Sequence, residues 1–139
     1  MTDDEREAFL KDARVAVLGT VDAKGRPHGA PVWYLYDGGD FRVSTGRGSR
    51  KHRNVETNSH VSLVIDTKQL PYLAVMVQGE AEIGGPMSEE DRLQLATRYL
   101  GNDIGKRYAE MTAADHENTV TLRIRPRHVA VYDSRNVGG

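Results

Sequence analysis

Two short turns divide the first third of this chain into segments of β-strand character. Residues 22–25 (Asp-Ala-Lys-Gly) and 37–40 (Asp-Gly-Gly-Asp) are typical of tight turns, because glycine adopts the positive φ angles that other residues avoid. The segments around them, residues 15–21, 28–36 and 41–45, are rich in Val, Thr and aromatic residues. We therefore predict three strands joined by two tight turns, in an antiparallel meander. Pro31 has no backbone N–H, so we expect it at an edge or a bulge of the sheet.

The rest of the chain predicts three more strands and four helices. Further strands are predicted at residues 60–66, 72–83 and 119–132, with a bulge at Gly79. Helices are predicted at residues 2–11, 50–56, 88–100 and 103–111, where capping residues begin the first and third and Gly101 ends the third. Six strands in mostly sequential antiparallel order favour a mainly-β fold, a small β-barrel with a few peripheral helices. No linker or repeat divides the chain, so residues 1–139 are expected to form a single domain.

The composition restricts the possible classes of function. The chain has no cysteine, which excludes disulfides, thiolate metal sites and a thiol nucleophile. Its 19 basic and 20 acidic residues give a formal net charge of −1, whereas a protein that binds nucleic acid through its overall charge is normally basic. No apolar run approaches the roughly 18 residues that span a bilayer, and the acidic start lacks the apolar segment of a secretory signal. We expect a cytoplasmic protein whose function depends on a local site.

A basic loop that leads into the short helix at residues 50–56 is the clearest candidate for that site. Residues 42–53 contain five of the 19 basic residues and no acid. Ser49 is suited to cap the helix, and a helix N-terminus binds phosphate through its unpaired N–H groups and partial positive charge. We predict that the hydroxyls of Thr45 and Ser49 and the cations of Arg50 and Lys51 complete an anion-binding turn. The alternative is a solvated basic loop that only caps a helix; the GxxxxGK[ST] and GxGxxG patterns are both absent.

Trp33, the only tryptophan, is the second candidate. Alternation along the strand would place Val32 and Trp33 on opposite faces of the sheet, so Trp33 either fills the core or forms an apolar wall against a flat ring. The five histidines lack the spacing of zinc ligands, and no serine has a GxSxG context, which disfavours a zinc site and a serine hydrolase. No pair of carboxylates stands out in a strand or loop. These features favour a protein whose chemistry is carried by a bound cofactor.

Segments over nearly the whole chain resemble a known family. They are residues 19–28, 31–34, 43–45, 49–54, 61–64, 77–83, 98–101, 125–129 and 132–133. In order and spacing they resemble the flavin-binding split β-barrels of the pyridoxamine 5'-phosphate oxidase-like family, over about residues 8–135. Within that family the chain is most similar to the flavin/deazaflavin-dependent oxidoreductases that use coenzyme F420. The resemblance implies a six-stranded split β-barrel and a homodimer with two cofactors at the subunit interface.

The resemblance also implies roles for particular residues. Those expected to hold the cofactor phosphate are Thr45, Ser49, Arg50 and Lys51, and those expected along its ring system are Pro31, Val32 and Trp33, with Gln78 approaching from the partner. Cations at Arg47, Arg53 or His52 would suit the acidic tail of F420, which is therefore the expected cofactor, with FMN as the alternative.

The expected reaction is hydride transfer from reduced F420 to an electron-poor conjugated molecule such as an enone, a quinone or a tetrapyrrole. An FMN-dependent oxidoreductase or FMN-binding protein of the same fold is one alternative, and a non-catalytic cofactor carrier is another. Pyridoxamine oxidation itself is disfavoured, because the C-terminal substrate pattern of those enzymes is missing. Nucleic-acid binding is disfavoured because the basic patch is short and lacks interleaved aromatic residues.

Overall fold

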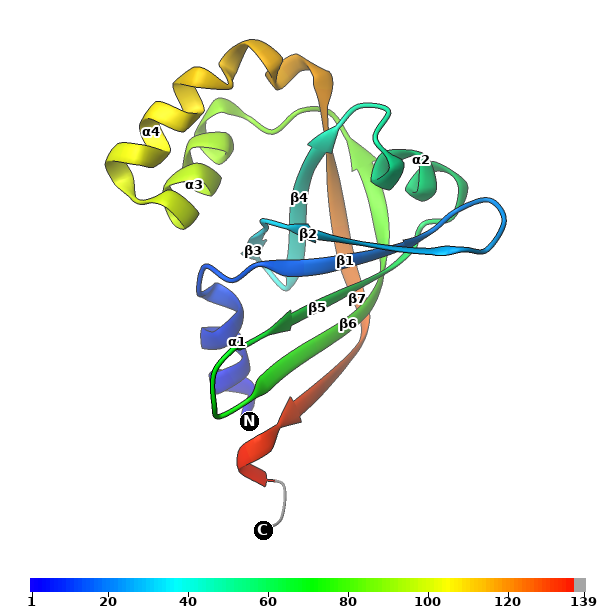
Figure 1. The fold of residues 1–139 in the computed structure, drawn as a ribbon, viewed down its shortest axis with the longest axis vertical. Helices are drawn as coiled ribbons and strands as arrows, with labels where there is room; N and C mark the ends of the chain where they lie inside the picture. Colours follow the sequence, from blue (N-terminus) through cyan, green and yellow to red (C-terminus); the bar gives the residue numbers. More distant parts are fainter. Residues whose placement is uncertain (137–139) are drawn as a thin grey trace.

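The computed structural model describes residues 1–136, which form one curled antiparallel sheet with helices around it (Figure 1). The strands of this part of the chain are β1 (Ala16–Val21), β2 (Pro27–Val32), β3 (Leu35–Asp37), β4 (Asp40–Gly46), β5 (His60–Asp66), β6 (Leu73–Gly84) and β7 (Thr119–Asp133). Its helices are α1 (Asp3–Lys11), α2 (Arg50–Thr57), α3 (Glu89–Leu100) and α4 (Asn102–Met111), with two 3-10 helices, η1 (Ala113–Asn118) and η2 (Ser134–Asn136). No helix within residues 1–136 is long and apolar enough to cross a bilayer.

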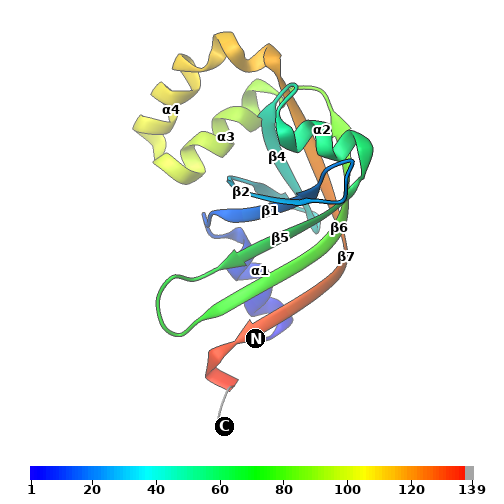
Figure 2. The same cartoon turned by 45° about the vertical axis from the view of Figure 1, so that its right-hand side comes forward.

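The sheet has the strand order β2-β1-β5-β6-β7-β4-β3 and curls around a single main core (Figures 1 and 2). Alternate residues of the strands point into this core, as in β1, where Ala16, Leu18 and Thr20 are buried. Phe9 and Leu10 of α1 pack against the same cluster. The mainly-β split barrel with peripheral helices is thus confirmed.

Several local predictions are confirmed. Gly25 has a φ of 78° and Gly38 a φ of 59°, so both predicted turns use a conformation that favours glycine. The pairing of β6 with β7 shifts register at Gln78/Gly79, where a Cβ on Gly79 would lie 2.5 Å from the Arg125 carbonyl oxygen. The strand that contains Pro31, β2, lies at an edge of the sheet, where a residue without an N–H is tolerated.

The prediction of one strand over residues 28–36 is wrong. β2 ends at Val32 and β3 begins at Leu35, which raises the number of strands from six to seven. Trp33 and Tyr34 leave the ladder because α3 offers them better partners. The ring of Trp33 stacks on Tyr99, and the N–H of Tyr34 donates to the Tyr99 hydroxyl at 3.1 Å. Val32 and Trp33 therefore do not alternate across one strand.

The predicted three-strand meander is wrong for the same reason. Both hairpins form at the predicted turns, but β1 pairs with β2 and β5, while β4 pairs with β3 and β7. The break at Trp33 and Tyr34 lets the chain pass from one edge of the sheet to the other. Because the sheet curls, residues from both edge regions meet around one cavity.

Candidate functional site

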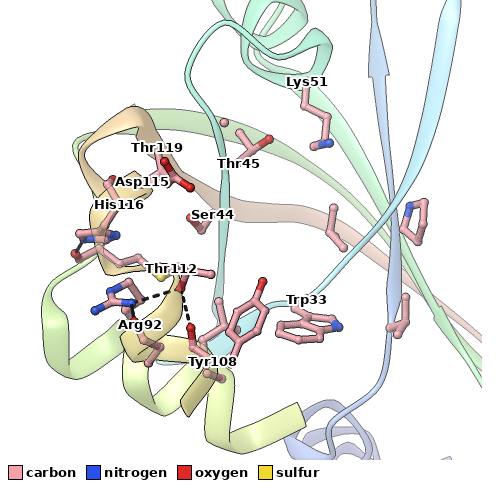
Figure 3. A pocket seen from close by; sticks show the side chains of 18 residues that line it. Trp33, Ser44, Thr45, Lys51, Arg92, Tyr108, Thr112, Asp115, His116 and Thr119 are labelled. Carbon is pink, nitrogen blue, oxygen red and sulfur yellow. Dashed lines mark hydrogen bonds between the residues drawn. The ribbon is translucent and has the colours of Figure 1, made fainter. Parts of the chain in front are cut away.

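A cavity of about 690 Å³ lies between the edge regions of the sheet and the α3–α4 pair (Figure 3). Strands β2 and β4, the first turn of α2, helices α3 and α4, and η1 all contribute to its lining. Five of the ten residues predicted to bind a cofactor line it: Pro31, Val32, Trp33, Thr45 and Lys51. These five residues, which lie up to 20 positions apart in the sequence, are thus brought to one site.

Lys51 and Thr45 form one end of the cavity (Figure 3). Ser49 caps α2 by accepting a hydrogen bond from the N–H of His52, and its Oγ lies 3.0 Å from Oγ1 of Thr45. Lys51 follows in the first turn of the helix and is half-buried. The only acid of α2, Glu56, faces His52, and within residues 1–136 the Lys51 ammonium has no ion-pair partner. This end can therefore accept an anion.

Aromatic rings form the other end of the cavity. The rings of Trp33 and Tyr99 are stacked, with centroids 4.8 Å apart and planes 4° apart, and the Tyr108 ring is tilted against Trp33 at 5.8 Å. The Tyr99 hydroxyl donates to the Arg14 carbonyl at 2.7 Å, which anchors the stack to the segment before β1. Trp33 thus provides a flat, fixed apolar surface beside the cavity rather than filling the main core.

Helices α3 and α4 supply a wall that the sequence did not reveal. Apolar side chains from this region, Met87, Leu95, Ala96, Tyr108 and Ala109, line the cavity together with the polar residues Arg92, Thr112, Asp115, His116 and Thr119. Arg92 of α3 donates to the carbonyl of Ala109 and to the Thr112 hydroxyl, so its guanidinium links α3 to the end of α4. The sequence predicted helices at residues 88–100 and 103–111, but nothing local to them indicated that they would form a cavity wall.

The remaining predicted residues lie outside the cavity lining. Ser49 acts through the cap described above, Arg50 and Arg53 are exposed on α2, and Arg47 is exposed with a 3.5 Å hydrogen bond to the Thr119 carbonyl. Gln78 is exposed on β6 and borders a separate hollow of about 540 Å³. Its predicted approach to a cofactor across a dimer stays a prediction.

The basic patch is smaller than the charge count of residues 42–53 indicated. Arg42 donates to Asp91 at 2.6 Å and to Asp37 at 3.1 Å, so two acids outside that segment neutralise it. The Arg42 hydrogen bond also lowers the pKa of Asp91 below its ordinary value. Lys51, by contrast, carries its charge into the cavity.

The family model described as pyridoxamine 5'-phosphate oxidase matches residues 2–133. The chain belongs to this family. No curated protein sequence matches it. As a member of the pyridoxamine 5'-phosphate oxidase family it has many structural relatives, and four illustrate their range.

The conserved hypothetical protein Rv2991 from Mycobacterium tuberculosis is similar with a TM-score of 0.80 and 24% identity, over 100% of this chain and 89% of that one. A structure named F420 reductase has a TM-score of 0.75 and 25% identity, over 89% of this chain and 94% of that one. An FAD-binding protein from Mesorhizobium loti has a TM-score of 0.67 and 20% identity, over 96% and 93% of the two chains. The fold also occurs in HutZ, a heme storage protein from Vibrio cholerae. Relatives of this chain are thus named for flavin-type cofactors and for heme.

Proposed function

We propose that the protein is an oxidoreductase that binds coenzyme F420 in the cavity and transfers a hydride from the reduced coenzyme to an electron-poor conjugated small molecule. One observation carries this proposal: the cavity has an unpaired lysine at one end and, at the other, the ring of Trp33, which is held from outside the lining by its stack on Tyr99. A tricyclic ring with a phosphate on a flexible chain has the same two-ended character. The 25% identity to an F420 reductase supports F420 over other flavin-type cofactors.

The residues present fit such a group. Lys51 offers a point charge to a phosphate, and the Thr45 hydroxyl at the same end can donate a hydrogen bond. The Trp33 ring, held by Tyr99, offers a flat apolar surface to a ring system. A volume of about 690 Å³ lies within the ordinary range of ligand pockets.

In the proposed reaction, the role of the protein is to bind the cofactor and to orient it. When bound, reduced F420 supplies the hydride, so the site needs no acid–base pair of its own for that transfer. Lys51 anchors the phosphate, while Val32 and Trp33 define where the ring lies. Helices α3 and α4 cover one side of the cavity and would limit the access of water to a bound ring.

FMN is the alternative cofactor, because Lys51 and the Ser49 cap suit any single phosphate. Exposed Arg47 and Arg53 favour F420, since cations next to the turn suit an acidic tail. Purification from a host that lacks F420 separates the two: a yellow protein supports FMN, and a colourless protein that binds added F420 supports F420. Oxidation of the reduced cofactor by a panel of acceptors then distinguishes an enzyme from a non-catalytic carrier.

A homodimer is part of this proposal, supported by an apolar row on the outer face of the sheet. Directly paired residues on neighbouring strands share a face. Such pairs connect Pro31, Val17, Val64, Met76 and Ala130 across five strands. Val17 is 43% exposed, Val64 37% and Met76 36%. A continuous apolar row of this kind is typical of an interface between copies.

Lys51→Ala tests the site. Loss of a charged hydrogen bond is expected to weaken binding of F420 or FMN by about 1.5–3 kcal/mol, a factor of about 10–150. Lys24→Ala, in the exposed β1–β2 turn, is the matched control and should bind like the wild type. Fluorescence titration measures both. Unchanged affinity in Lys51→Ala, or a wild-type protein that binds neither F420 nor FMN, contradicts the proposal.

A further inference from the structure

The turn before α2 is held together by a side chain that does not line the cavity. The N–H of Gly48 donates to Nδ1 of His52 at 2.9 Å, and the N–H of His52 donates to Oγ of Ser49 at 3.3 Å. Oγ of Ser49 in turn lies 3.0 Å from Oγ1 of Thr45 at the cavity. Residues 45–52 are thus closed by three side-chain hydrogen bonds in series, and His52 takes part in two of them.

We propose that His52 is a positioning residue for the anion-binding end of the cavity, a role that rests on the proposed function. Gly48 has a φ of 78°. Glycine adopts positive and negative φ angles about equally readily, so its own preference does not fix this conformation. The bond from its N–H to His52 holds that conformation, which directs Ser49 toward Thr45 and sets where α2 begins. The first-turn N–H groups of Arg50 and Lys51, which have no acceptor within the helix, then face an anion in one fixed arrangement.

The geometry defines the protonation state that this role needs. Because Nδ1 accepts from a backbone N–H, it carries no proton, and a neutral ring has its proton on Nε2. Nε2 lies 3.8 Å from Oε1 of Glu56. His52 is only 9% exposed, so its ring is held in place by packing. It acts here as a hydrogen-bond acceptor, in contrast to the sequence-based prediction of a cation for an acidic tail.

Two substitutions separate the acceptor from the ring. His52→Asn can place its side-chain oxygen near the position of Nδ1 and retain the bond from Gly48. His52→Gln places its amide near the position of Nε2 and lacks an acceptor for Gly48. Both variants remain polar, so a difference between them does not reflect burial of an apolar side chain. His52→Ala removes both positions.

The experiment compares each ligand with its phosphate-free form, FMN with riboflavin and F420 with the corresponding deazariboflavin. His52→Gln and His52→Ala are expected to bind the phosphate-bearing member about tenfold more weakly, the scale of one hydrogen bond, and the phosphate-free member as the wild type does. His52→Asn should restore most of the loss. Hydrogen exchange in the ligand-free proteins should show faster exchange at the Gly48 amide in His52→Gln but not in His52→Asn.

Three outcomes would overturn the inference. The first is an equal loss of affinity for the phosphate-bearing and the phosphate-free ligand in His52→Gln. The second is tighter binding of the phosphate-bearing ligand in a variant that releases the Gly48 N–H. The third is equal affinity of His52→Asn and His52→Gln for the phosphate-bearing ligand. If the wild type binds the phosphate-bearing ligand and all variants bind it equally well, the role of His52 is refuted but the proposed function is not. A wild-type protein that binds neither pair refutes the proposed function, and this role with it.

Discussion

Gly105 allows α4 to lie directly against α3, and its replacement by alanine tests how closely the cavity wall is packed. A Cβ on Gly105 would lie 2.6 Å from Cα and 2.7 Å from N of Thr97, and 2.8 Å from the Ala96 carbonyl carbon. These neighbours are backbone atoms, so no side chain can rotate away. To reach an ordinary contact of 3.4 Å, α4 must move by about 0.8 Å.

The expected cost follows from two opposing effects. Overpacking of this kind costs about 1–3 kcal/mol, and a clash with backbone belongs near the upper limit. The greater helix propensity of alanine offsets about 1 kcal/mol. We therefore expect Gly105→Ala to lower the free energy of unfolding by about 1–2 kcal/mol and the melting temperature by about 3–7 °C. Because Tyr108 lies one turn further along α4 and contacts Trp33, tryptophan emission should change as well.

Thermal and urea unfolding, followed by Trp33 fluorescence and circular dichroism, measure both effects. Lys106→Ala is the control, since this neighbouring residue on α4 is exposed and its replacement should change stability by less than about 0.5 kcal/mol. The sign of the change in the free energy of unfolding decides between close packing and helix propensity. A Gly105→Ala protein that is more stable than the wild type, as helix propensity alone would require, refutes the close approach of the two helices.

Two other predictions concern the α3 contact with β4 and the outer face of the sheet. Arg42 lowers the pKa of Asp91 below its ordinary 3.8, so the pair stabilises the fold above that pH, and the stabilisation is lost as the pH falls through the folded-state pKa. Asp91→Asn should therefore be less stable than the wild type near neutral pH, by about 0.5–1 kcal/mol, and the difference should shrink in acid; a difference independent of pH in urea unfolding would contradict this. Val64→Asp should convert a dimer to a monomer, as measured by size-exclusion chromatography with light scattering. Leu93→Asp, at a similarly exposed apolar residue of α3, should remain a dimer. A wild-type protein that is a monomer would refute the proposed interface.

Local features of the chain were predictable because their causes lie within a few residues. Gly25 and Gly38 permit tight turns by their own conformational freedom, and the Ser49 hydroxyl reaches the N–H of a residue only three positions away. Strand periodicity likewise indicates which side chains face inward, whatever the partner strand is. Part of the candidate site, from Thr45 to Lys51, was predictable for the same reason.

The tertiary structure decided everything that depends on distant partners. Residues 28–36 have the composition of one strand, but Tyr99, 65 positions after Tyr34, takes the N–H that would continue the ladder. Arg42 has the same charge as Lys51 in the sequence, yet Asp91, 49 positions away, neutralises only Arg42. The physical reason is shared: a turn or a cap is favourable within its own segment, whereas a cavity wall or an ion pair depends on which segments the whole core brings together.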